Sequence, residues 1–248
     1  ISFTEALQHF QSAELSESRG KVRAPGRQGI LAALLRCLRG HPRLRPQLRG
    51  EQELALAMAQ CALDDSEWVH MRILQTIYQQ LTHSRQGCPR YGAHWEELGF
   101  QGRRGCNPLP GEIPRPIPKI HSNLPWRNSV LSQLPEPLPV FQTQLHWPPL
   151  DMLQHLNNFP FCIMSVNITR IVIQALQEER LSRECNRRQQ VIGVLNDLYA
   201  AAFLRLSRLW RRQHGTVADA GFFLKELELS TKKNPRQLLK SLEAYLSR

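Results

Sequence analysis

The sequence of 248 residues lacks any uninterrupted apolar run of the roughly 18 to 20 residues that a membrane-spanning helix requires. It also lacks alternating polar and apolar runs bounded by hairpin turns, and it has no repeat of fixed period. We therefore expect a soluble, cytoplasmic protein without strands, for which peripheral contact with a membrane or the cytoskeleton stays an alternative. The sequence begins at Ile1 rather than at a methionine, which indicates that an N-terminal segment precedes it.

The six cysteines form neither a C-x-x-C pair nor a Cys/His cluster at the spacing of zinc ligands. This spacing predicts reduced thiols and no metal site. Paired carboxylates, a Ser/His/Asp arrangement and a glycine-rich phosphate loop are also missing, so we expect no cofactor and no independent enzyme. Asn167-Ile168-Thr169 matches the N-glycosylation pattern but falls in an apolar helical stretch, and we interpret it as a chance match.

Positive charge is present in excess, since 32 Lys and Arg against 21 Asp and Glu give a formal net charge of +11. This favours an anionic partner such as nucleic acid, a lipid surface or an acidic protein face. Zinc-finger spacing, RNP aromatics and a helix-turn-helix are absent, so nucleic acid is an unlikely partner. Five arginines between Arg36 and Arg49 are broken by Pro42 and Pro46, which predicts a solvated linker in preference to a dedicated anion site.

Helical periodicity dominates the sequence and predicts an all-α fold. The expected helices cover 28–39, 51–83 with a restart at the capping box Asp64-x-x-Glu67, 161–185, 187–212, 217–229 and a last segment that opens at Asn234 and Pro235. In the second half of 51–83 the expected buried stripe begins at Trp68. The helix over 161–185 has so wide an apolar face, with Val166 and Ile173 included, that it is expected to be central to the core.

The clearest periodicity lies in 187–212, where apolar residues from Val191 to Trp210 form one stripe. Arg205, Arg208 and Arg212 recur on the opposite side, which predicts a solvated polar face and only secondarily a docking strip. Gly215 is expected to end this helix.

Residues 103–150 interrupt the helical pattern, because eleven of the seventeen prolines lie between Arg103 and Pro149. Proline removes an amide donor and favours extended geometry in the residue before it, so this segment is expected to be polyproline-like or irregular. No pair of these prolines has the P-x-x-P spacing of SH3 ligands, which makes an SH3 bait a minor hypothesis.

The phrase HWEELGFQG, from His94 to Gly102, resembles the opening of the signature of ELMO-domain proteins. The segments FPFCIMSVNITRIVIQALQEERLSRECN and GFFLKELELSTKKNPRQLLKSLEAYL are also similar to that family. The resemblance implies a single multi-helix ELMO-type domain interrupted by the proline-rich segment. Its expected parts are a basic N-terminal region over 1–50, a first part over 51–102, the proline-rich insert or replacement over 103–150 and a second, helical part over 151–248.

The resemblance further implies GTPase activation towards Arf and Arf-like small GTPases, for which family members use an arginine. Laid without gaps, that arginine falls on Pro110, so the catalytic group is absent in this register. Arg103, Arg104 and Arg115 are nearby basic surface candidates, but a proline-rich chain lacks the helical support that positions a catalytic group, and we expect none of them to replace it. One hypothesis is that 103–150 replaces helical sequence through alternative splicing or a misassembled gene model.

The surviving motif residues are the candidates for contact with a GTPase: Trp95, Gly99, Phe100, Gln101 and Gly102. Structural roles are the competing interpretation, with the aromatic residues as core anchors and the glycines as turn residues. Two functions follow from the resemblance: an impaired GTPase activator, or a non-catalytic adaptor like the arginine-lacking family members that bind Dock-type exchange factors. The partners would be an Arf-like GTPase and other signalling or cytoskeletal proteins.

Overall fold

The computed structural model describes residues 1–12, 42–61, 64, 66–82, 84, 87 and 161–247, without the side chains at 81 and 161–163. All regular elements within these residues are helical, which confirms the predicted all-α class. The α-helices are α1 (Phe3–Ser12), α4 (Arg49–Met58), α5 (Trp68–Thr82), α9 (Phe161–Gln177), α10 (Ser182–Arg188), α11 (Ile192–Arg212), α12 (Ala220–Lys233) and α13 (Pro235–Leu246). Two 3-10 turns, η1 (Pro46–Leu48) and η3 (Val217–Asp219), precede α4 and α12. None of these helices is both long and apolar enough to span a bilayer.

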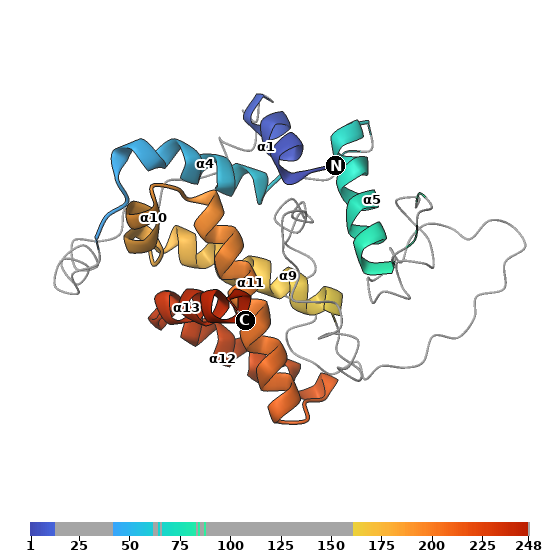
Figure 1. Ribbon diagram of the computed structural model, residues 1–248, viewed down its shortest axis with the longest axis vertical. Helices are drawn as coiled ribbons and strands as arrows, with labels where there is room; N and C mark the ends of the chain where they lie inside the picture. The colour runs from blue at the N-terminus through green and yellow to red at the C-terminus, as the bar shows by residue number, and fades with distance from the viewer. Residues whose placement is uncertain are drawn as a thin grey trace, which may run out of the picture.

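Helix α11 is the centre of the described bundle, because α4, α9, α10, α12 and α13 all contact it (Figure 1). The five consecutive residues from Ala200 to Leu204 are all buried. Since successive residues of a helix point about 100° apart, such a run is buried only where neighbours cover every side. The prediction of one apolar stripe with an open opposite face is therefore wrong for the middle of this helix.

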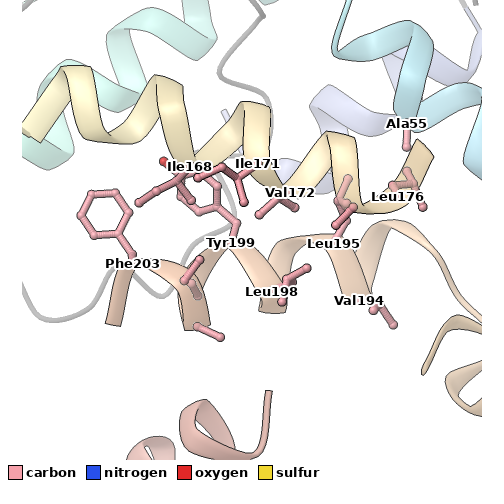
Figure 2. Close-up of a cluster of buried hydrophobic side chains, with 14 of the residues drawn as sticks. Ala55, Ile168, Ile171, Val172, Leu176, Val194, Leu195, Leu198, Tyr199 and Phe203 are labelled. Atoms are coloured by element: carbon pink, nitrogen blue, oxygen red, sulfur yellow. The ribbon is translucent and has the colours of Figure 1, made fainter. Parts of the chain in front are cut away.

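The interface between α9 and α11 forms the largest part of the core that Figure 2 shows. Ile168, Ile171, Val172 and Leu176 of α9 lie opposite Leu195, Leu198, Tyr199 and Phe203 of α11, with Ala55 of α4 at one end, whereas Val194 points away from α9. All of these side chains are buried. Burial of a Val, Leu, Ile or Phe side chain is worth about 1.5 to 3 kcal/mol relative to exposure, so this interface contributes strongly to the stability of the described helices.

The segment 161–185 is two helices rather than one, and its first helix, α9, lies in the core as expected. α9 ends at Gln177, Glu179 has a left-handed backbone with φ of 59°, and α10 begins at Ser182. The apolar pattern continues through this break because residues on both sides of the turn, including Leu181 and Cys185, face the same core. Val166 and Ile173, which were expected to be buried, are half-buried.

The helix expected over 187–212 begins at Ile192, because Gln189 is left-handed, with φ of 54°, and ends α10. The segment expected as a helix over 217–229 starts with η3, and α12 then runs to Lys233. The expected opening of the last helix is confirmed, with Asn234 at the N-cap and Pro235 in the first turn.

Helix α5 buries Ile73 and Ile77 of the expected stripe, but that stripe does not begin at Trp68. Trp68 is 65% exposed, whereas Val69, Ile73 and Ile77 are buried. The predicted start of the buried stripe at Trp68 is therefore wrong, and the reason is tertiary, since the face that α5 buries is decided by where α1 packs on it. The turn before α5 is closed by Asp64, whose Oδ1 accepts hydrogen bonds from the amide and the hydroxyl of Ser66 at 2.9 and 2.7 Å.

The arginines of α11 are not simply solvated, as the sequence suggested. Arg205 Nη2 lies 3.1 Å from Glu226 Oε1 on α12, and the Arg208 guanidinium lies 5.7 Å from the ring centroid of Tyr245 on α13. Arg212 is exposed, as expected. Two of the three arginines therefore fasten α12 and α13 to the central helix, through an ion pair and a cation–π contact.

The end of α11 depends on Gly215 for a reason that the sequence pattern did not indicate. His214, with φ of 50°, takes the left-handed position, and the amide of Gly215 donates to the carbonyl of Trp210 at 2.9 Å. A Cβ at Gly215 would lie 2.6 Å from Phe223 Cε2 and 2.9 Å from Trp210 Cδ2. The glycine is needed because its backbone touches two buried aromatic rings.

We expect Gly215→Ala to destabilise the protein by about 1 to 3 kcal/mol, since neither ring can move without repacking the α11–α12 contact. Gly193→Ala is the matched control, because its Cβ meets only the Gln190 side chain, which is exposed and can rotate away. This control should gain about 0.5 to 1 kcal/mol from better helix propensity. Urea denaturation of both variants measures the difference, and equal stabilities would contradict this account of Gly215.

Candidate functional site

The residues predicted to form the site lie outside the described part of the chain. They are Trp95, Gly99, Phe100, Gln101, Gly102, Arg103, Arg104 and Arg115, and Pro110 lies there as well. The same holds for the helix predicted over 28–39 and for the proline-rich segment. Their roles stay predictions, and the described helices are those that precede and follow these residues in the chain.

Helices α9 and α12 are joined by a network of four charged side chains. Lys232 Nζ lies 2.9 Å from Glu178 Oε1 and 2.8 Å from Glu228 Oε1, and Arg170 Nη2 lies 3.7 Å from Glu228 Oε2. The hydrogen bond from Lys232 holds the pKa of Glu228 below its ordinary value. Burial alone would lower the pKa of Lys232, but its two carboxylate partners raise it. The network fixes the end of α9 on α12.

Arg188 joins three helices at the other side of the bundle. Its side chain is 16% exposed, and its Nη1 pairs with Asp197 of α11 while its Nη2 lies 3.0 Å from Glu243 Oε1 of α13. A guanidinium suits this position because its planar set of donors can reach two carboxylates at once. This contact explains why α10, which is short, has a defined place.

Glu184 of α10 has a side chain that is only 3% exposed. One of its oxygens accepts from Arg187 Nη2 at 2.7 Å, and the other lies 3.7 Å from Arg236 Nε of α13. Both arginines are more than half exposed, so one buried carboxylate faces two cations at the surface. The sequence placed these three residues on separate helices and indicated no contact between them.

The thiols in the described part of the chain are poor nucleophiles. Burial, the larger cause, and the nearby Glu51 raise the pKa of Cys185 to about 12. Burial also raises the pKa of Cys61, which is half-buried. No three or more His, Cys, Asp or Glu side chains among the described residues are grouped closely enough to hold a metal ion. What this part of the chain supplies is a charged and packed scaffold.

A small aromatic cluster holds α1 on α5. The His70 ring is 4% exposed and stacks on Phe10, with ring centroids 5.6 Å apart, and His9 lies edge-on to it at 5.9 Å. The amide of Asp64 donates to His70 Nδ1 at 3.0 Å, so the neutral ring carries its proton on Nε2. Burial lowers the pKa of His70, and repulsion from His9 adds to this, while Glu67 and Asp64 act in the opposite direction.

We expect the chain to lose stability as the pH falls below about 6.5, the ordinary pKa of histidine, because the unfolded chain then takes up a proton that folded His70 does not bind. The loss continues down to the lowered pKa of the folded state. His70→Leu should flatten this dependence, whereas His9→Gln should keep most of it, since burial is the larger cause of the shift. Denaturation midpoints between pH 8 and 5 measure both slopes, and an unchanged slope in His70→Leu would contradict the assignment.

Comparison with known proteins by family model and by individual relatives points to one family. The sequence model of the ELMO/CED-12 family matches residues 53–108 and 135–224, more than half of the chain, and leaves 109–134 unmatched. The chain is 47% identical to ELMO domain-containing protein 3 of Bos taurus, 48% to that of Homo sapiens and 46% to that of Mus musculus. Each alignment covers 100% of this chain and 62% of the relative, so the chain spans less than two thirds of their length. No solved structure is a significant match.

Proposed function

Because the chain belongs to the ELMO/CED-12 family, we propose that it binds an Arf or Arf-like small GTPase and is impaired as an activator of GTP hydrolysis. The family match carries this proposal, since its first segment ends at 108 and so includes Trp95, Phe100 and Gln101. These motif residues, with Gly99 and Gly102, are proposed to face the GTPase. The chain itself is proposed to make no covalent change to a substrate, and its described helices form a packed scaffold.

The impairment follows from the chemistry of phosphoryl transfer. Charge grows on the γ-phosphate oxygens in the transition state, and an arginine that neutralises it contributes about 10³ to 10⁵ in rate where such a residue acts. In the ungapped register Pro110 stands at this position, and its ring can neither carry charge nor donate a hydrogen bond. The family match stops two residues before it, at 108, which agrees with a departure from the family here.

The second candidate function is a non-catalytic adaptor that uses the same helical scaffold to hold regulators of small GTPases together. Pro110 favours it, because an adaptor needs the docking surface of the family but not the arginine. The two functions differ in one measurable property, the rate of GTP hydrolysis when the GTPase is bound.

The test is single-turnover hydrolysis by a panel of Arf and Arf-like GTPases loaded with GTP, with the 248-residue chain in excess. Binding is measured separately with a non-hydrolysable GTP analogue. We expect at least one GTPase to bind and its hydrolysis rate to stay within about tenfold of the intrinsic rate, far from the enhancement that an arginine supplies. Binding without any acceleration selects the adaptor, and weak acceleration selects the impaired activator.

Arg103→Ala, Arg104→Ala and Arg115→Ala test whether a replacement arginine exists. Arg212→Ala, an exposed arginine at the end of α11, is the control for loss of one positive charge. Strong acceleration that one of the three variants abolishes and the control preserves would overturn the proposed impairment. Failure to bind any member of the panel would overturn the proposed partner itself.

A further inference from the structure

The described part, 42–49, of the segment that was expected to be a solvated linker is docked on α10. Leu44 and Leu48 are buried, each 6% exposed, and Asn186 of α10 binds the backbone on both sides of Leu44. Asn186 Oδ1 accepts from the amide of Arg45 at 2.9 Å, and its Nδ2 donates to the carbonyl of Arg43 at 2.8 Å. The chain from 42 to 49 is therefore a fixed part of the surface, which gives its arginines a defined position.

This docking brings arginines from distant parts of the sequence to one end of the bundle. Figure 1 shows the start of α4, all of α10 and the start of α13 along the same edge of the molecule. The contacts of Asn186 with 43–45 and the ion pair between Glu184 and Arg236 hold these three parts together. Six exposed arginines lie on them and are called the basic end below: Arg43, Arg45, Arg49, Arg183, Arg187 and Arg236.

Most of this charge is not neutralised by the protein. Among the described residues, no carboxylate lies within 4.0 Å of Arg43, Arg45, Arg49 or Arg183. By contrast, Arg188 at the end of α10 and Arg205 of α11 are paired with carboxylates of other helices. Arg187 and Arg236 share one carboxylate, that of Glu184, which is turned inward. Four unpaired guanidinium groups at one edge are unfavourable for the chain alone, and a surface rich in phosphate groups would compensate them.

The chemistry around the basic end distinguishes among anionic partners. The large exposed hydrophobic residues of the described chain lie elsewhere, at Trp68, on η3 and α12, and at the far end of α13. A specific protein interface needs an apolar centre that excludes water, and single-stranded nucleic acid needs aromatic side chains on which bases stack. The basic end offers charge without either feature, which is what a diffuse anionic lipid surface requires.

We propose that the basic end docks the chain on an anionic phospholipid surface, with the phosphate groups of several lipids facing Arg43, Arg45, Arg49 and Arg183. Binding is electrostatic and reversible, and it decreases with salt because the contacts are exposed. The inference does not depend on the GTPase proposal, since the basic end uses no residue of the Trp95–Gly102 motif.

The experiment is vesicle co-sedimentation of the 248-residue chain with phosphatidylcholine vesicles and with vesicles that also contain phosphatidylserine. We expect binding to the second kind alone, and a marked decrease when salt is raised. The variant Arg45→Gln/Arg49→Gln/Arg183→Gln should partition on the order of 100-fold more weakly, since each basic residue near an anionic leaflet contributes separately. These side chains are exposed and unpaired, so the variant should keep the circular dichroism spectrum of the parent and melt at the same or a slightly higher temperature.

The matched control is Arg211→Gln/Arg212→Gln/Lys225→Gln, which removes the same charge from exposed positions at the end of α11 and on α12. It should retain most of the vesicle binding. Equal losses in the two variants would show that net charge alone drives binding, and would overturn the assignment to the basic end. So would a parent chain that ignores phosphatidylserine vesicles, or one that binds duplex RNA more tightly than vesicles through the same three arginines.

Discussion

Phe203→Ala is expected to destabilise the chain by about 3 to 5 kcal/mol, the range for removal of a buried phenylalanine ring. Phe203 is 1% exposed in the middle of α11, with its ring 5.9 Å from that of Tyr199. The surrounding residues belong to helices that cannot all close on the cavity, because α11 is covered on several sides at once. Since a protein of this size is stable by about 5 to 15 kcal/mol, the variant should be close to unfolding.

Phe222→Ala is the control for this prediction. The same ring is removed from α12, but Phe222 is 62% exposed and its contact is edge-on with Phe223 at 5.8 Å. Its loss should stay within about 0.5 to 1 kcal/mol, the energy of one exposed aromatic pair. Urea denaturation followed by circular dichroism compares the two variants, and similar midpoints would contradict the placement of α11 at the centre of the core.

The double variant Arg187→Ala/Arg236→Ala is expected to cost about 3 kcal/mol, because it leaves the Glu184 carboxylate buried without a cation. The value is at the lower end of the range for broken buried pairs, since Glu184 lies in the first turn of α10, where helix amides favour negative charge. Each single arginine variant should cost much less than half of this value, because the other arginine still faces the carboxylate.

The additional change Glu184→Leu separates an unpaired charge from lost packing. Placed in the double variant, it removes the charge and should recover most of the lost stability, even though one more native group is gone. Thermal melts of the double and triple variants decide the question. A triple variant less stable than the double variant would show that Glu184 contributes through its shape and not as a paired charge.

For the functional site, the sequence identifies candidate residues that lie outside the part of the chain that the structure describes. The family resemblance was based on Trp95, Phe100 and Gln101 and on sequence segments after residue 158, and the family match confirms the family. The roles of these residues in the site stay predictions, because the described residues do not include them. The alignment of Pro110 with the family arginine also stays a prediction. The basic end is the opposite case. The sequence shows the arginines from Arg36 to Arg49 as one run, but only the structure places Arg183 and Arg236 near the end of that run.

Local sequence determined what depends on neighbours along the chain. Proline and glycine positions, helical periodicity and the Asn234-Pro235 opening established the all-α class and the existence of most described helices, because backbone hydrogen bonding and apolar faces are decided within a few turns. Tertiary structure decided which faces are covered. It buried the middle of α11 on all sides, exposed Trp68, turned Arg205 into a link to α12 and fixed 42–49 on α10. These outcomes depend on helices far apart in sequence, and no pattern within one helix contains the position of its neighbour.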